Sequence, residues 1–198
     1  MTAAPPKLGP FDLERVFRAV DKITERLNRA TATLDAAGIP YAVIGGNAVA
    51  NWVSRIDESM TRFTKDVDIL LRPTDLDIAE AALTVSGFHK RTTLGIVAFH
   101  DGPEGKFGDA IHVVLAGQKV RPDYLLPAPD VEERERGPNY FILNLDALVR
   151  MKLTSNRDHD RTHIRDLMRV GLVDETWLSR VPCELVERLK YCLDTPDG

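Results

Sequence analysis

The sequence has few cysteines, no excess of positive charge and no long hydrophobic run. Its 198 residues include only Cys183 and Cys192, which argues against a disulfide framework and favours free thiols. The net charge of −4 provides no global field that would attract nucleic acid. No stretch approaches the length of a membrane-spanning helix, and the N-terminus lacks the apolar core of a signal peptide. These absences favour a compact cytoplasmic protein without a membrane partner.

Hydrophobic patterning divides the chain into four stretches. Residues 1–10 contain three prolines and are predicted to be a disordered lead. Residues 11–117 are predicted to form an α/β domain that begins with a long amphipathic helix at 11–37. Residues 118–143 contain four prolines and an acidic-basic run, which predicts a long connection too polar for the core. Residues 144–198 are predicted to be helical.

The predicted elements alternate in the first half of the chain and are helical in the second. Strands are expected at 41–44, around Asp66 and Asp68, and at 88–93, 95–100 and 110–115. Helices are expected at 47–55, at 73–85 with Asp75 as an N-cap or first-turn acid, and at 145–155, 158–170, 174–180 and 183–193. This order predicts an α/β (α+β) fold, with a mixed sheet flanked by helices and a helical C-terminal region packed on it.

The most informative motif is the pair of carboxylates at Asp66 and Asp68 in an apolar run. Because side chains alternate along a strand, both carboxylates point to the same face. Two such groups repel each other unless a cation lies between them, and Mg²⁺ prefers oxygen ligands. The pair therefore predicts a site for Mg²⁺ or Mn²⁺, with Asp66 and Asp68 as the protein ligands.

A second motif lies about twenty residues earlier, where Gly45 and Gly46 separate a predicted strand from a predicted helix. A Gly-Gly turn at this place brings backbone N–H groups close to a phosphate. Mg²⁺ held by one or two carboxylates usually completes its shell with water and substrate phosphates. Together the two motifs predict a site for a metal-bound nucleoside triphosphate (NTP).

These motifs resemble the nucleotidyltransferase superfamily with the DNA-polymerase-β-like fold. The resemblance is carried by strand, Gly45-Gly46, helix and Arg62-x-Thr64-x-Asp66-x-Asp68, and by Leu148 to Lys152, Arg157 to Asp160 and Asp166-Leu167. It covers roughly residues 40–170 and is closer to small bacterial members that include the AbiEii-type toxins. It implies Mg²⁺-dependent transfer of a nucleoside monophosphate (NMP) from an NTP to tRNA, a protein or a small molecule. A cognate antitoxin would then be a partner.

Three basic residues are candidates for binding the triphosphate beside Gly45 and Gly46. Arg62 precedes the metal strand, and it either faces phosphate, braces an aspartate or lies on the surface. Lys65 adjoins Asp66 and is assigned to the same nucleotide site. Lys152 lies beside the apolar stripe of its predicted helix, so its ammonium group either extends to solvent or reaches into the cleft.

One position departs from the pattern of the superfamily. Active members carry a third carboxylate on a neighbouring strand, whereas this chain has His112 at the expected place, and Asp109 is predicted to face the other side. A neutral imidazole can accept a proton near pH 7 but binds Mg²⁺ less well than oxygen does. Two hypotheses follow. Either Asp66, Asp68 and His112 are catalytic, or the protein is a degenerate nucleotide-binding or partner-binding module.

Three other patterns favour less specific interpretations. His159 and His163 match a zinc-protease helix, but Asp replaces the catalytic Glu, and Asp160 is expected to pair with Lys152 or an arginine. Arginines 157, 161, 165 and 169 favour a solvated, ion-paired face over a phosphate-binding ridge for RNA such as tRNA. The Asp-x-Asp motif of sugar transferases usually follows a nucleotide-binding half of about 100 residues, whereas only 65 residues precede Asp66.

Overall fold

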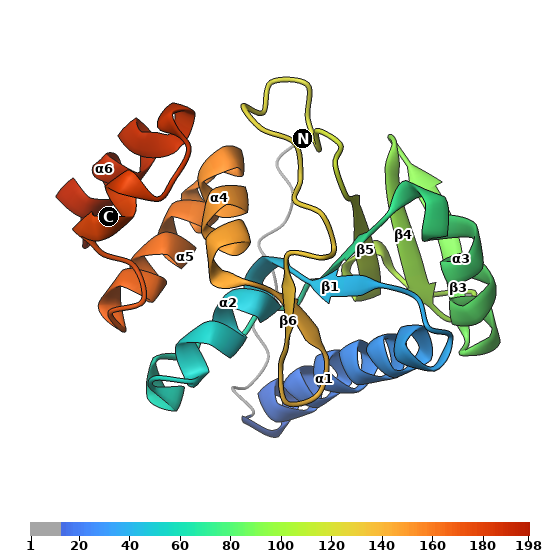
Figure 1. Ribbon diagram of the computed structural model, residues 1–198. Coiled ribbons are helices and arrows are strands. Elements are labelled where there is room, and N and C mark those ends of the chain that lie inside the picture. Colours follow the sequence, from blue (N-terminus) through green and yellow to red (C-terminus); the bar gives the residue numbers. More distant parts are fainter. Residues whose placement is uncertain (1–12) are drawn as a thin grey trace, which may run out of the picture.

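The computed structural model describes residues 13–198, and the predicted disordered lead at 1–10 lies outside the described residues. Its core is a seven-stranded sheet with helices on both faces (Figure 1). The strands are β1 Tyr41–Val43, β2 Val67–Leu71, β3 Phe88–Thr93, β4 Ile96–Asp101, β5 Ala110–Leu115, β6 Arg134–Arg136 and β7 Phe141–Leu143. The α-helices are α1 Leu13–Ala36, α2 Gly45–Ser54, α3 Leu76–Val85, α4 Leu145–Ser155, α5 Asp158–Arg169 and α6 Val186–Asp194.

The sheet is mixed, which confirms the predicted fold class. Its strand order is β3-β4-β5-β2-β1-β7-β6, with β2–β5 and β1–β7 parallel and the remaining pairs antiparallel. The parallel pairing of β2 with β5 sets Asp68 opposite His112. Residues that are 44 positions apart in the sequence therefore lie side by side.

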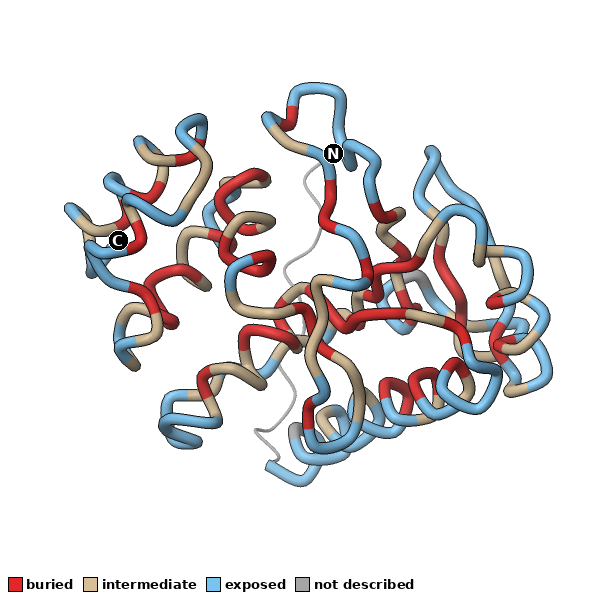
Figure 2. Tube along the Cα trace, in the orientation of Figure 1, coloured by how far each residue is buried: buried red, intermediate tan, exposed pale blue. Residues whose placement is uncertain are grey.

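The two faces of the sheet bury different helices. On one face, Val67, Ile69 and Leu71 of β2 pack in a cluster that includes Leu27 and Leu34 of α1. The other face carries Leu70 of β2 in a second cluster that includes residues of α2, α4, α5 and α6. Figure 2 shows that the buried segments concentrate on the central strands and on the helix surfaces that face them. Asp68 shares its face with Leu70 because side chains alternate, so the aspartate faces the second layer of helices.

The turn between α4 and α5 is defined by local chemistry. The Asn144 side chain accepts a hydrogen bond from the Ala147 N–H at 2.9 Å and so caps the start of α4. Asn156 ends the helix in the left-handed conformation, with φ of 48°. The chain therefore reverses sharply, and α5 begins at Asp158. By contrast, Asp75 makes no capping hydrogen bond to α3, although α3 follows it directly.

The stretch 118–143 differs from the prediction of a polar connection outside the core. Val131 is fully buried, and Tyr124 and Ala128 are nearly so. The segment also contains β6, which pairs with β7 and extends the sheet beyond β1. β6 and β7 have three residues each, too few to show a period-2 pattern, so only the pairing of β7 with β1 and of β6 with β7 makes them recognisable.

The described part of the chain contains no helix that is long and apolar enough to cross a membrane. Cys183 is exposed and Cys192 is buried, and both are free thiols, as expected.

Candidate functional site

A cleft of about 520 Å³ lies between one face of the sheet and the turn that joins α4 to α5. It is lined by six of the eight residues that the sequence predicts for the site: Gly45, Gly46, Asp66, Asp68, His112 and Lys152. The other two, Arg62 and Lys65, do not line it.

Gly45 and Gly46 are required by close contacts at the start of α2. Gly45 has φ of +68°, and a Cβ atom there would lie 2.1 Å from Asp68 Oδ2. A Cβ atom on Gly46 would lie 2.9 Å from the Cβ of Thr64. No side chain caps the N-terminus of α2, and Ile44 N–H donates to the Asp68 carbonyl oxygen at 3.0 Å. The two glycines therefore let the uncapped helix N-terminus pack directly against the aspartate strand.

Asp66 directly precedes β2, Asp68 is its second residue, and both line the cleft. The Asn47 side chain of α2 donates to the Asp66 carbonyl oxygen at 2.7 Å, which ties this end of the strand to the glycine helix. Carboxylate oxygens are the ligands that Mg²⁺ prefers. Across residues 13–198, no three His, Cys, Asp or Glu side chains gather into a possible metal cluster. The two carboxylates are chemically compatible with a Mg²⁺ ion that takes its remaining ligands from water and substrate phosphates.

His112 lies on β5, directly beside Asp68. Its Nδ1 is 3.7 Å from Asp68 Oδ1, and its side chain is 17% exposed. Asp109 does not replace the missing carboxylate, because it contacts Arg26 Nη2 at 3.5 Å and does not line the cleft. An imidazole at this position can act on a proton beside the carboxylate pair.

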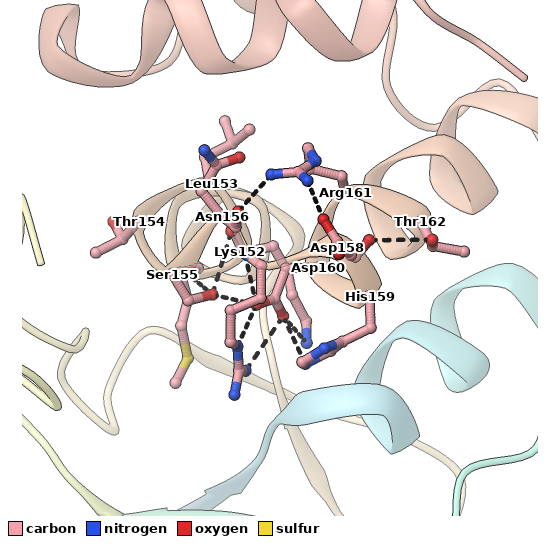
Figure 3. Close-up of polar contacts among 12 residues, drawn as sticks. Lys152, Leu153, Thr154, Ser155, Asn156, Asp158, His159, Asp160, Arg161 and Thr162 are labelled. Atoms are coloured by element: carbon pink, nitrogen blue, oxygen red, sulfur yellow. Dashed lines mark hydrogen bonds and ion pairs between the residues drawn. The ribbon is translucent and has the colours of Figure 1, made fainter. Parts of the chain in front are cut away.

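The opposite wall of the cleft is built around Asp160, whose side chain is fully buried. Lys152 Nζ donates to Asp160 Oδ1 at 3.0 Å, and Ser155 Oγ donates to Oδ2 at 2.7 Å (Figure 3). Arg157 Nε donates to Oδ2 at 2.7 Å. The predicted pairing of Asp160 with Lys152 or an arginine is confirmed, and both partners bind it. Burial raises the pKa of Asp160, but Lys152 and the hydrogen bonds from Arg157 and Ser155 outweigh burial and leave it well below the usual range.

Arg157 is the site residue that sequence reasoning missed. It lines the cleft at the N-terminal boundary of α5, and its side chain is 47% exposed. By its spacing, Arg157 belongs to the series of arginines four residues apart for which a solvated, ion-paired face is expected. The signal that distinguishes it is its position directly after the left-handed Asn156, where the chain turns toward the cleft.

The other members of the arginine series have intramolecular partners. Arg161 pairs with Asp158, and Figure 3 shows this pair apart from the contacts that converge on Asp160. Arg165 is buried and donates to Thr195, while Arg169 Nη1 lies 3.2 Å from Asp166 Oδ1. Arg62 also belongs to this network, because its Nε is 2.8 Å from Asp166 Oδ2. Arg62 therefore braces an aspartate of α5 beside a second, smaller cavity.

His159 and His163 both line the cleft, on successive turns of α5. Their ring centroids are 5.9 Å apart and their planes meet at 81°. Burial, together with the nearby charge of Lys152, lowers the pKa of His163 to about 4. His163 is therefore neutral at pH 7.

The cleft also has apolar lining residues. It is lined by Leu94 and Ile96 at the tip of the β3–β4 hairpin, and by Val120 and Leu126 of the loop that follows β5. Backbone hydrogen bonds close this loop at its base, from Gly117 N–H to Ala128 O at 3.0 Å and from Ala128 N–H to Gln118 O at 2.9 Å. The lining of the cleft therefore combines charged and apolar side chains, and Lys119 and Arg121 of the loop after β5 add two cations to it.

Comparison with solved structures finds the same overall fold in several proteins. An antigenic nucleotidyltransferase-like protein from Paracoccidioides brasiliensis is 20% identical, with 88% of this chain and 93% of that chain covered and a TM-score of 0.53. ANT(2″)-Ia, in complex with adenylyl-2″-tobramycin, is 14% identical over 86% of this chain and 95% of that chain, with a TM-score of 0.51. JHP933 from Helicobacter pylori is 17% identical over 91% and 76%, also with a TM-score of 0.51.

These similarities show that the chain has a nucleotidyltransferase-like fold, as the sequence motifs predict. No protein-family model matches the sequence, and no curated protein matches it either. The closer likeness to AbiEii-type toxins stays a prediction from the motifs.

The buried ion pair generates a prediction on stability. Asp160→Asn removes the charge that compensates Lys152, whose side chain is only 6% exposed, and should lower the free energy of unfolding by about 3 kcal/mol. Urea unfolding followed by circular dichroism measures the change. Asp158→Asn is the matched control, because Asp158 is 95% exposed, and it should change stability by less than about 0.5 kcal/mol. Equal effects of the two substitutions would contradict the assignment.

His163 generates a prediction on pH dependence. Its folded-state pKa of about 4 lies below the ordinary value of 6.5, so between these pH values the unfolded chain binds more protons than the folded one. Stability should therefore fall as the pH drops from 6.5 to 4, with at most about 3 kcal/mol attributable to His163. His163→Gln should flatten that fall, while replacement of the exposed His89 by Gln should not. Unfolding free energies at pH 7 and pH 4.5 provide the comparison.

Proposed function

We propose that this protein is a metal-dependent nucleotidyltransferase, which transfers an NMP from an NTP to an acceptor and releases pyrophosphate. The observation that carries the proposal is the packing of the Gly45-Gly46 helix N-terminus against Asp68, at a distance that only glycine permits. Two carboxylates and an uncapped helix N-terminus thereby open into one cleft. This pairing of a cation site with an anion site suits a metal-bound triphosphate.

Each group has a distinct task in the proposed reaction. Asp66 and Asp68 would hold Mg²⁺ or Mn²⁺, which when bound neutralises phosphate charge and polarises the α-phosphate. The N-terminus of α2 binds phosphate oxygens. His112 takes the proton from the acceptor hydroxyl, whose oxygen forms the new bond to the α-phosphorus while the bond to pyrophosphate breaks. Positioning and charge neutralisation then supply most of the rate enhancement.

A second candidate function follows from the identity of residue 112, which is histidine. His112 stands beside Asp68, where the superfamily resemblance implies a third carboxylate, and an imidazole binds Mg²⁺ less well than oxygen does. A protein with this site could bind nucleotide without efficient turnover. The two candidates share a fold and a nucleotide site, and they differ only in whether NMP leaves the site attached to an acceptor.

The charges in the cleft bear on the class of acceptor. The acidic residues that line it are Asp66, Asp68 and Asp160, and Asp160 is already bound by Lys152 and Arg157. If a metal ion occupies Asp66 and Asp68, no carboxylate among the cleft-lining residues is left for an ammonium group. We therefore propose a neutral or anionic acceptor, which leaves tRNA, a protein hydroxyl and a small molecule open. The cytoplasmic location, the toxin role and the antitoxin partner rest on sequence alone.

The catalytic proposal predicts loss of transfer in Asp68→Asn. Because a metal site that loses one of two carboxylates binds its ion poorly, NMP transfer should fall at least about 100-fold. The measurement is label transfer from each α-³²P-labelled NTP, with Mg²⁺ or Mn²⁺, to total tRNA or lysate. Asp77→Asn, on the exposed side of α3 across the sheet, should retain wild-type activity.

The same assay separates the two candidate functions through His112→Asp. Transfer by the wild-type protein that vanishes in Asp68→Asn supports the enzyme. Transfer that appears only in His112→Asp would show that the natural site is degenerate. NTP binding without transfer in either protein would favour the binding module.

The charge argument yields a separate prediction about aminoglycosides. Although ANT(2″)-Ia was solved with adenylyl-2″-tobramycin, this chain should not adenylylate tobramycin, a polycationic amine, with ATP and Mg²⁺. Mass spectrometry of the antibiotic after incubation would show no mass gain of one adenylyl group. Detection of that adduct at a rate comparable to transfer onto lysate acceptors would refute the charge argument.

A further inference from the structure

We propose that Arg157 is the side chain that binds the phosphates of the nucleotide, and that Lys152 is a positioning residue that does not touch them. The inference rests on the proposed function and deepens it. It reverses the expectation from the sequence, which assigns this task to Lys152. The reason lies in how the three charges of Lys152, Arg157 and Asp160 are shared.

The Lys152 side chain is buried, and its ammonium group is bound inside the protein. Its side chain is 6% exposed, and its ammonium donates to Asp160 Oδ1 at 3.0 Å. Moving the ammonium onto a phosphate would separate it from a carboxylate that is fully buried. Breaking a buried pair in this way costs several kcal/mol per ion, so Lys152 holds Asp160 in place.

The guanidinium group of Arg157 is bound by Asp160 along one edge, and its other edge is not hydrogen-bonded within the described residues. Its Nε donates to Asp160 Oδ2 at 2.7 Å, and its Nη2 lies 3.4 Å from Oδ1. Within residues 13–198, no hydrogen bond engages Nη1, and about half of the side chain is exposed where it lines the cleft. A guanidinium that is anchored through one edge presents the remaining N–H groups in a fixed fork, which matches phosphate oxygens.

The position of Arg157 also points to phosphate. Its backbone N–H lies 3.3 Å from Asp160 Oδ2, so main chain and side chain are held by one carboxylate. Burial lowers the pKa of Arg157, but the hydrogen bond and the charge of Asp160 outweigh burial and raise it, and the charge of Asp68 across the cleft makes a smaller contribution in the same direction. Phosphates bound between a metal ion at Asp68 and the N-terminus of α2 would therefore lie within its electrostatic reach.

Charge balance supports the same assignment. Lys152, Asp160 and Arg157 together carry one positive charge, and Arg157 is the exposed member that presents it. Asp66 and Asp68 would offset a divalent ion, which leaves the triphosphate in need of a further cation. Lys119 and Arg121 also line the cleft, but Arg157 supplies this charge from the wall opposite Asp66 and Asp68, with its guanidinium anchored by Asp160.

The test uses inorganic tripolyphosphate with Mg²⁺, because this probe has no base or sugar and reports the phosphate contacts alone. Isothermal titration calorimetry on the full-length chain should show at least a tenfold weaker Kd for Arg157→Gln. Arg157→Lys, which keeps the charge and loses the fork, should fall between this variant and the wild type. Arg180→Gln is the matched control, since Arg180 is 46% exposed and pairs with Asp146 outside the cleft, and it should bind as wild type.

The outcomes separate this inference from the proposed function. Wild-type affinity in Arg157→Gln, with NMP transfer intact in the wild-type protein, would overturn the role of Arg157 and leave the enzyme standing. A loss of binding in Lys152→Met that exceeds the loss in Arg157→Gln, with both variants folded by circular dichroism, would return the contact to Lys152. If the wild-type protein neither binds the probe nor transfers NMP, the proposed function fails, and this inference fails with it.

Discussion

The arrangement of α4, α5 and the cleft wall between them depends on the ion pairs and hydrogen bonds of the Asp160 carboxylate. This carboxylate is fully buried, and it accepts hydrogen bonds from Lys152 and Ser155 of α4 and from Arg157 at the start of α5. One charged group thus joins two helices at a sharp turn and defines the wall of the cleft opposite Asp66 and Asp68. A buried ion cluster is poor evidence for stability, but losing one member leaves an uncompensated charge. Its value here lies in holding a guanidinium at a defined place beside the cleft.

The opposite wall depends on the absence of side chains. Gly45 and Gly46 bring the N-terminus of α2 against Asp68 and Thr64, at distances that a Cβ atom would forbid. The parallel pairing of β2 with β5 adds His112 to the same face. One wall is therefore held by a buried cluster of charged side chains. The other is held by close packing at two glycines, where a larger side chain would not fit. Both constraints leave little conformational freedom for the groups that line the cleft.

Local signals in the sequence predicted much of this arrangement. The bounds of α4 and α5 and the C-terminal end of α1 lie within one residue of the prediction, since apolar periodicity, the Asn144 cap and the following turn are encoded over short distances. The predicted start of α1 at residue 11 lies outside the described residues. The strand β6 was missed, because three residues show no period and the pairing depends on strands far away in sequence. Lys152 lines the cleft as expected, but its ammonium is bound to Asp160, which helical spacing alone could not reveal.

By itself, the sequence determined the fold class, the carboxylate pair and the glycine turn, because each follows from periodicity or from residues close along the chain. The tertiary structure alone decided which residues meet. It set His112 beside Asp68 through strand pairing, placed Arg62 on Asp166, and divided the basic charges at Asp160 into a buried lysine and an exposed arginine. Burial and contacts between residues distant in the sequence decide which charged side chains lie in the interior and which face the cleft. Neither can be predicted from the spacing of residues along one helix.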